Sequence, residues 1–183
     1  MGPFRRCKNM QVHFSSNRMD WATPRWVYDR IVGELSPEPP LLDVCASIDN
    51  RKCTRYYGEE DNALVKPWDD SFWMNPPYGR GIGQWVQRAM QQAQEHTVIG
   101  TCLLPARTDT AWWHDYVMEG AALVYLIRGR IKFELPDGAE NSAPFPSAVV
   151  IFDPWHPGPV YVRPWCLHGR TSAATLHGNM EAS

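Results

Sequence analysis

The segment that most constrains the fold is a short apolar stretch, SFWMN at residues 71–75, which runs directly into Pro76, Pro77 and Tyr78. Two adjacent prolines end a strand because neither can donate a backbone hydrogen bond, and their rings fix the direction of the chain. A helix pattern follows at once, with apolar residues at helical spacing on one face: Ile82, Trp85, Val86, Ala89, Met90 and Ala93. This order of strand, rigid turn and helix predicts an α/β unit.

The same alternation of strand and helix patterns extends over most of the chain. Before this unit, WATPRWVYDRIVGEL predicts a helix that Thr23 caps, with Pro24 in its first turn. After it, TVIGTCLL is apolar without alternation, as expected of a parallel strand covered on both faces. Further strands are expected at LLDVC, RYYG, ALVYLI, GRIKFEL and SAVVIFD, with a short helix over residues 110–118. The sequence therefore predicts an open α/β sheet with helices on both faces and a late antiparallel strand.

The 183 residues are expected to form one domain. We assign residues 1–19 to an N-terminal arm, residues 20–165 to the domain and residues 166–183 to a flexible tail. No apolar stretch approaches the roughly 20 residues that cross a bilayer, and no signal-peptide pattern opens the chain. The five cysteines show no paired spacing, which indicates a reducing compartment and a cytoplasmic protein.

The residues after the SFWMN strand are suited to chemistry on an exocyclic amine. Asn75 offers a side-chain carbonyl and Pro76 a backbone carbonyl, two acceptors that can hold the two hydrogens of such an amine. Pro76 and Pro77 fix the direction of these acceptors, and the ring of Tyr78 can stack on a flipped base. The alternative is a Pro-Pro turn that only ends a strand, and for an isolated NPPY the two interpretations are comparable. The strand before the motif and the amphipathic helix after it favour the chemical interpretation.

NPPY in this setting resembles the catalytic motif of amino-methyltransferases that use S-adenosylmethionine (SAM). More narrowly, an ordered series of segments resembles the phage-type DNA N(6)-adenine methyltransferases, whose fold is Rossmann-like. The series comprises DWATP, LLDVCAS, YYGEEDNAL, FWMNPPYGRGIGQWVQRA, LLPARTDTAWWH, IRGRIKF and PFPSAVVIF, over residues 20–153. NPPY alone is shared with enzymes that methylate protein glutamine or RNA, so the ordered series is the more specific signal. One departure is that DVCAS has no glycine after the first strand, where SAM enzymes usually carry several.

The resemblance implies roles for individual residues. Asn75, Pro76 and Tyr78 would hold the target adenine, and the cofactor would be surrounded by Trp21, Thr23, Pro24, Asp43, Cys45 and Ala46. From the residues alone, Asp43 at a strand end could accept a hydrogen bond from the cofactor's ammonium group or cap the next turn. Asp61 or Glu60 could bind the ribose hydroxyls or the adenine amine of SAM, or belong to a solvated acidic loop.

Double-stranded DNA is the expected partner, and a formal net charge of −2 does not exclude it because binding depends on local charge. Arg128, Arg130 and Lys132 flank an expected hairpin and could contact phosphates, although charged runs are often only solvated. In the loop at residues 136–146, Asn141 and Ser142 could hydrogen-bond base edges.

No zinc-ligand spacing joins the cysteines and histidines, so no metal is expected. Two alternatives stay open. One is methylation of RNA or of a protein amide with the same motif, and the other is a catalytically silent nucleic-acid-binding protein with the same fold.

Overall fold

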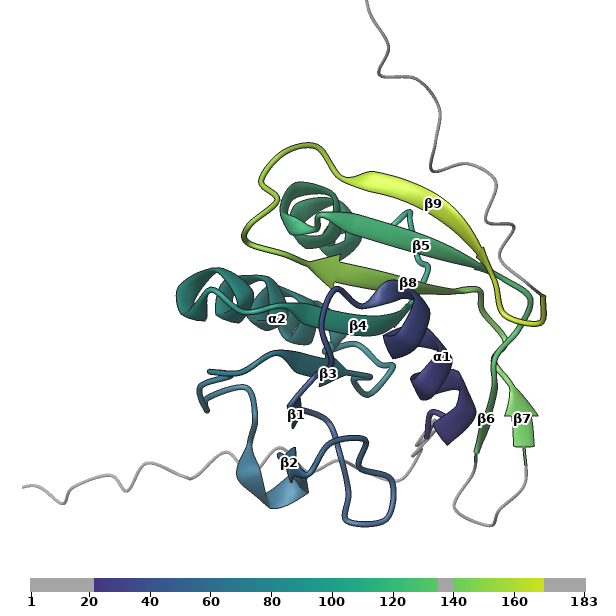
Figure 1. The fold of residues 1–183 in the computed structure, drawn as a ribbon, viewed down its shortest axis with the longest axis horizontal. Helices are drawn as coiled ribbons and strands as arrows, with labels where there is room; N and C mark the ends of the chain where they lie inside the picture. Colours follow the sequence, from purple (N-terminus) through teal and green to yellow (C-terminus); the bar gives the residue numbers. More distant parts are fainter. Residues whose placement is uncertain (1–21, 135–139, 170–183) are drawn as a thin grey trace, which may run out of the picture.

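The computed structural model describes residues 22–134 and 140–169, apart from the side chains of Glu140 and Asn141. The predicted arm, Trp21 and most of the predicted tail lie outside these residues. Within them, helices and strands alternate along the chain (Figure 1). The helical elements are α1 (Arg25–Leu35), η1 (Glu59–Asp61), α2 (Ile82–His96) and η2 (Trp113–Met118). The strands are β1 (Leu42–Asp43), β2 (Arg55–Tyr56), β3 (Phe72–Met74), β4 (Gly100–Pro105), β5 (Leu123–Arg128), β6 (Lys132–Glu134), β7 (Glu140–Ser142), β8 (Ser147–Phe152) and β9 (Tyr161–Cys166).

Seven strands form one open sheet in the order β2-β1-β3-β4-β8-β5-β9. Strand β8 runs antiparallel to both of its neighbours, and the other pairs are parallel. In Figure 1, β4, β5 and β9 point toward the β6–β7 hairpin, whereas β8 points away from it. We call the edge at which the parallel strands end the carboxyl edge. The predicted open α/β sheet with a late antiparallel strand is confirmed.

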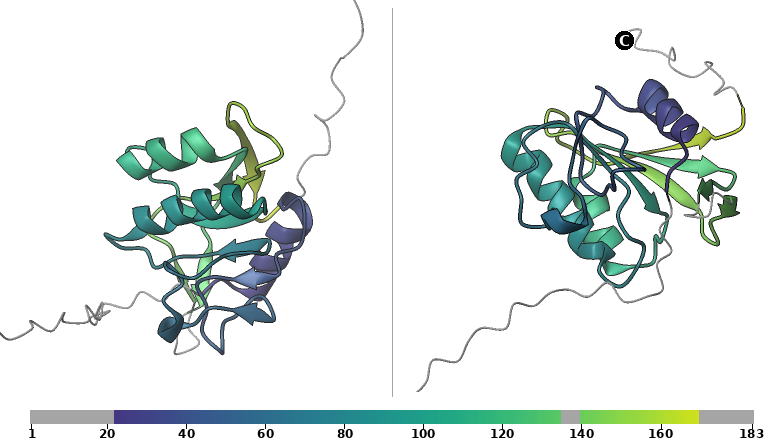
Figure 2. Two further views of the ribbon diagram at one scale, coloured as in Figure 1. Left: turned by 90° about the vertical axis from the view of Figure 1, so that its left-hand side faces the viewer. Right: turned by 90° about the horizontal axis from the view of Figure 1, so that it is seen from below.

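Both faces of the sheet are covered by helices, as predicted. Figure 2 shows α2 and η2 on one face and α1 on the other. Strand β3 alternates between the two resulting layers of the core: Phe72 and Met74 pack with α2, whereas Trp73 packs with α1. Residues 72–74 are therefore apolar without interruption because both sides of the strand are buried.

The helix after the NPPY motif forms as its pattern predicts. Ile82, Val86, Ala89 and Ala93 are buried along one face of α2, and Trp85 and Met90 flank them. Gln92 is a buried exception on a face expected to be polar. Its side-chain carbonyl accepts a hydrogen bond from the Trp68 backbone N–H at 2.8 Å, which compensates for its burial.

Three local predictions are wrong. Thr23 does not cap α1: Pro24 is the N-cap residue, and no side chain caps the helix. The GRIKFEL segment does not join the main sheet, because β6 pairs with β7 in a separate two-stranded sheet. Strand β7 lies within what was expected to be a loop. An additional strand, β9, pairs in parallel with β5, and Leu167 beyond it is buried.

Candidate active site at the carboxyl edge

Adjacent strands bring the predicted site residues to one edge of the sheet. Asp43 ends β1 and Asn75 follows β3, and these strands are paired in register, with Asp43 opposite Trp73. Strand β4 lies on the other side of β3 and is followed at the same edge by Ala106 and Arg107. Ligands of open α/β sheets bind outside such strand ends.

The NPPY segment contains two hydrogen-bond acceptors, Asn75 Oδ1 and the Pro76 carbonyl, whose surroundings differ. The Tyr78 hydroxyl donates to Asn75 Oδ1 at 2.7 Å, and the Leu103 carbonyl lies 3.3 Å from the same hydroxyl. Among the described residues, none donates to the carbonyl of Pro76. An amide carbonyl has two lone pairs and can accept more than one hydrogen bond.

The ring of Tyr78 lies edge-on to two phenylalanines of the hairpin region. Its centroid is 5.2 Å from that of Phe145 and 6.2 Å from that of Phe133, with interplanar angles of 74° and 86°. Burial raises the pKa of the Tyr78 hydroxyl above its ordinary value, so the group stays a hydrogen-bond donor. The contacts join the NPPY segment to the β6–β7 hairpin.

Asp43 organises the loop that follows β1. Its two carboxylate oxygens accept the backbone N–H groups of Cys45 at 3.2 Å and Lys52 at 2.9 Å. The side chain is buried, and burial raises its pKa to about 6 in spite of these two bonds. Asp43 therefore caps the turn after β1, one of its two expected roles. A contact with the ammonium group of a ligand would use the remaining lone pairs of its carboxylate oxygens.

The start of α1 packs beside this loop and beside the hairpin. Arg25 donates from its guanidinium to the Lys52 carbonyl at 3.0 Å, and Ala22 forms a β-bridge with Glu134 of β6. Between these contacts, Thr23 is buried and its hydroxyl has no hydrogen-bond partner among the described residues. A buried hydroxyl without a partner is costly and is a feature that a bound polar ligand could satisfy.

The remaining predicted cofactor residues flank the same loop. The Ala46 backbone N–H donates to the Tyr57 carbonyl at 3.0 Å, and burial raises the pKa of the neighbouring Cys45 thiol well above its ordinary value. Asp61 lies in η1, where it accepts from the Gly58 N–H at 2.8 Å and pairs with Lys66. The hydrogen bond from Lys66 lowers the pKa of Asp61, so this carboxylate is already engaged locally.

The predicted DNA-contacting residues lie around the hairpin at the carboxyl edge. Arg128 ends β5, Arg130 is in the turn that follows, and Lys132 opens β6; all three are exposed. Gly129 between the arginines has φ +107°, a conformation that L side chains rarely adopt, and it lets the chain leave the sheet. Ser142 is opposite Lys132 in the hairpin and is exposed, while Asn141 lies in β7 opposite Phe133.

Sequence reasoning missed three side chains that contribute to this edge. Phe133 and Phe145 contact Tyr78, and the guanidinium of Arg107 lies 5.8 Å from the ring centroid of Phe145. Applying the strand-end rule to TVIGTCLL would have drawn attention to Arg107. The two phenylalanines gave no local signal, because their contacts depend on how the hairpin folds back.

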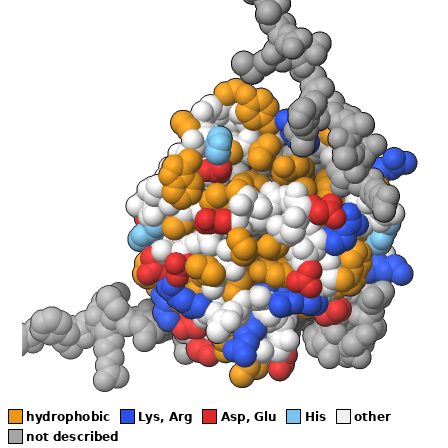
Figure 3. All heavy atoms as spheres, viewed as in Figure 1, with side chains coloured by type: hydrophobic (Ala, Val, Ile, Leu, Met, Phe, Trp, Pro, Cys, Tyr) orange, Lys and Arg blue, Asp and Glu red, His pale blue; other side chains and the backbone are white. Residues whose placement is uncertain are grey.

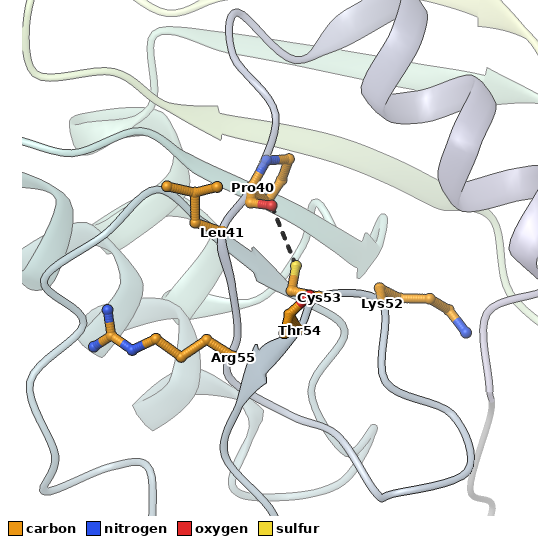
Figure 4. A pocket seen from close by; sticks show the side chains of 6 residues that line it. All are labelled: Pro40, Leu41, Lys52, Cys53, Thr54 and Arg55. Carbon is orange, nitrogen blue, oxygen red and sulfur yellow. Dashed lines mark hydrogen bonds between the residues drawn. The ribbon is translucent and has the colours of Figure 1, made fainter.

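Other surfaces offer less to a ligand of this kind. A hollow of about 600 Å³, lined by Pro40, Leu41, Lys52, Cys53, Thr54 and Arg55, lies where β1 and β2 begin (Figure 4). The Cys53 thiol donates to the Pro40 carbonyl there at 3.3 Å. On the face shown in Figure 3, acidic and basic side chains are intermixed rather than segregated by sign. Within the described ranges, no cluster of His, Cys, Asp or Glu could hold a metal ion, and no helix is long and apolar enough to cross a membrane.

An open α/β sheet with an NPPY segment at its carboxyl edge agrees with the class of amino-methyltransferases that the sequence resembles. The family model described as DNA N-6-adenine-methyltransferase (Dam) matches residues 12–165, most of the chain. The chain therefore belongs to this family, and the family resemblance inferred from its sequence is confirmed.

Two relatives agree with this assignment. The DNA N-6-adenine-methyltransferase of Escherichia phage T1 is 32% identical over 108 residues, which cover 58% of this chain and 44% of the phage protein. YfdM of Escherichia coli strain K12, named provisionally as a methyltransferase, is 35% identical over 68 residues, which cover 32% of this chain and 69% of that protein. The chain thus aligns with less than half of the phage enzyme.

Proposed function

We propose that this protein transfers a methyl group from S-adenosylmethionine to the exocyclic amine of adenine in double-stranded DNA. The family match supports this proposal, and one structural observation carries it. The Asn75 side-chain carbonyl and the Pro76 backbone carbonyl follow β3 directly at the carboxyl edge, on a chain made rigid by Pro76 and Pro77.

The chemistry requires little acid–base catalysis from the protein. The lone pair of an aromatic amine is delocalised into the ring, so the nitrogen is a weak nucleophile. Asn75 Oδ1 and the Pro76 carbonyl would accept its two hydrogens, favour a tetrahedral nitrogen and direct the lone pair. SAM would supply the methyl group to this nitrogen with cleavage of its own carbon–sulfur bond, and the nitrogen would lose one proton to solvent.

Residues of this chain would hold SAM beside the amine site. SAM supplies the electrophilic methyl group when bound. Asp43 would accept from its ammonium group, and the unpartnered Thr23 hydroxyl would hydrogen-bond to its polar end. Cys45 and Ala46 line the loop between them, and Trp21 and Pro24 would complete the site. Asp61 is a weaker candidate for the ribose because Lys66 and Gly58 already engage it.

The hairpin would provide the DNA contacts that so small a domain needs. Arg128, Arg130 and Lys132 would contact phosphates, and Asn141 and Ser142 would approach base edges. Their place at the carboxyl edge, with Phe133 of the same hairpin against Tyr78, supports this assignment.

The test is methyl transfer by the purified protein from labelled SAM to DNA isolated from cells without adenine methylation. The product is hydrolysed to nucleosides and separated, and the label is expected in N6-methyladenine. Parallel reactions with RNA and with a protein extract test the two alternative substrates, RNA and protein amide nitrogen. Label in RNA or in protein glutamine, with none in DNA, would refute the proposal. Failure to bind SAM at all would favour a silent DNA-binding protein.

A further inference from the structure

Arg107 is a cation at the carboxyl edge that has no carboxylate partner among the described residues. Several other described cations are neutralised locally: Arg25 pairs with Asp29, Arg30 with Glu34, Arg55 with Asp69 and Asp70, and Lys66 with Asp61. Exposed arginines without a carboxylate are free to bind an anion from solution.

The backbone at Arg107 is held in place, although its side chain is exposed. Ala106 donates from its N–H to the Pro146 carbonyl at 2.9 Å, and Thr110 donates from its N–H and its hydroxyl to the Arg107 carbonyl at 3.1 and 2.8 Å. The first of these bonds joins the residue after β4 to Pro146, which precedes β8 and follows Phe145, and the other two close a turn after Arg107. Arg107 is therefore presented from a rigid base rather than from a free loop.

The guanidinium of Arg107 lies over Phe145, which in turn contacts the ring of Tyr78. The distance from the guanidinium carbon to the Phe145 centroid is 5.8 Å, and the Phe145 and Tyr78 centroids are 5.2 Å apart. The Tyr78 hydroxyl completes the series at Asn75 Oδ1, 2.7 Å away. A continuous set of contacts thus links an exposed cation to the proposed amine acceptor.

We propose that Arg107 binds a DNA phosphate beside the target nucleotide, and that Phe145 is a positioning residue that couples this contact to the ring of Tyr78. The inference rests on the proposed function, since it takes the Asn75 acceptor as the amine site. An enzyme that rotates a nucleotide out of the duplex must hold the backbone on which it turns, and phosphate contacts fix that register. Arg107 is placed to hold that backbone, because its guanidinium lies over Phe145, which contacts the ring of Tyr78.

The first test compares binding of a short duplex that carries 2-aminopurine opposite an abasic site, over a series of salt concentrations. R107Q is expected to reduce the slope of log affinity against log salt by roughly one unit, the contribution of one phosphate contact. R107K keeps the charge and should keep the slope. Arg163→Gln on β9 removes an exposed arginine at the far edge of the sheet and should also leave the slope unchanged. A wild-type slope in R107Q would overturn the phosphate contact.

The second test asks whether Phe145 affects turnover through the Tyr78 ring, without any change in the charge that binds DNA. F145L should retain the wild-type salt slope and SAM affinity but lower kcat at saturating DNA by about tenfold, because the Tyr78 ring is no longer held. F145Y keeps the ring and should restore kcat. The effects of R107K and F145L on kcat should be less than additive, since both break the same contact series. Wild-type kcat in F145L would refute the positioning role.

If the wild-type protein methylates no adenine, the proposed function itself fails. The salt dependence of DNA binding by R107Q would still show whether Arg107 contacts a phosphate.

Discussion

Asn75 is the residue on which the proposed chemistry depends most directly. Its Oδ1 accepts the Tyr78 hydroxyl at 2.7 Å, which fixes the direction of the amide at the end of β3. Asn75→Ala removes one of two preorganised acceptors, so turnover is expected to fall by on the order of 100-fold or more. Gln94→Ala, an exposed amide on α2, is the matched control and should keep wild-type turnover. Full activity in a folded Asn75→Ala protein would rule out the mechanism.

Tyr78 combines a ring and a hydroxyl with separate roles. Tyr78→Phe keeps the ring against Phe133 and Phe145 and loses only the hydroxyl, with its contacts to Asn75 and Leu103, so appreciable activity should remain. Tyr78→Ala removes the proposed stacking surface, and this variant should lose most of the activity. Fluorescence of 2-aminopurine at the target position measures flipping directly. Equal flipping by Tyr78→Ala and wild type would show that the stacking role is wrong.

Asp43 makes the stability of the protein depend on pH. Burial raises its pKa from 3.8 to about 6 in the folded state, so the folded protein binds this proton more tightly than the unfolded chain. The resulting stabilisation is complete below pH 3.8 and is lost as pH rises through about 6. The difference in unfolding free energy between wild type and Asp43→Asn should therefore fall by on the order of 3 kcal/mol over that interval. Urea unfolding at several pH values measures it, and a difference that is independent of pH would contradict the burial argument.

At the scale of elements, the close contact between β4 and β3 depends on Gly100. A Cβ at this position would lie 2.3 Å from Cζ of Phe72, a ring that is itself fully buried. Gly100→Ala should therefore destabilise the protein by roughly 1–3 kcal/mol through overpacking. Gly33→Ala in the last turn of α1 is the matched control, because nothing lies within 4 Å of the added atom. That control should stabilise the protein by about 1 kcal/mol, since alanine favours helix. Equal midpoints for both variants in thermal unfolding would contradict this account of the packing.

Elements with strong local patterns could be predicted, and those that depend on distant partners could not. Strand β3 and helix α2 carry clear patterns and form where expected. Strand β9 was missed because Pro164 lies within it and most of its residues are exposed. An edge strand tolerates such a sequence, since one side has no partner. Strand β7 is three residues within a turn-like segment and exists only through its pairing with β6.

The same distinction applies to the candidate site. The strand-end rule brought Asp43 and Asn75 to one edge, and the structure places them on paired strands. Thr23 was predicted as a helix cap, yet the helix begins one residue later and leaves its hydroxyl buried without a partner among the described residues. Phe133 and Phe145 could not be assigned from spacing, because only the folded hairpin region brings them to Tyr78. Arg107 follows the end of β4, where the strand-end rule would have found it.

At the scale of the whole molecule, one sheet edge gathers the proposed amine acceptors, the proposed cofactor residues and several exposed cations. The central claim is that this edge methylates adenine in DNA. The most direct measurement is to express the full chain in cells that lack adenine methylation and to map modified bases in their DNA by single-molecule sequencing. Our account predicts N6-methyladenine at a defined sequence context with the wild type, and its loss with Asn75→Ala expressed at the same level. Unmodified adenine with the wild type, or equal modification by both proteins, would contradict it.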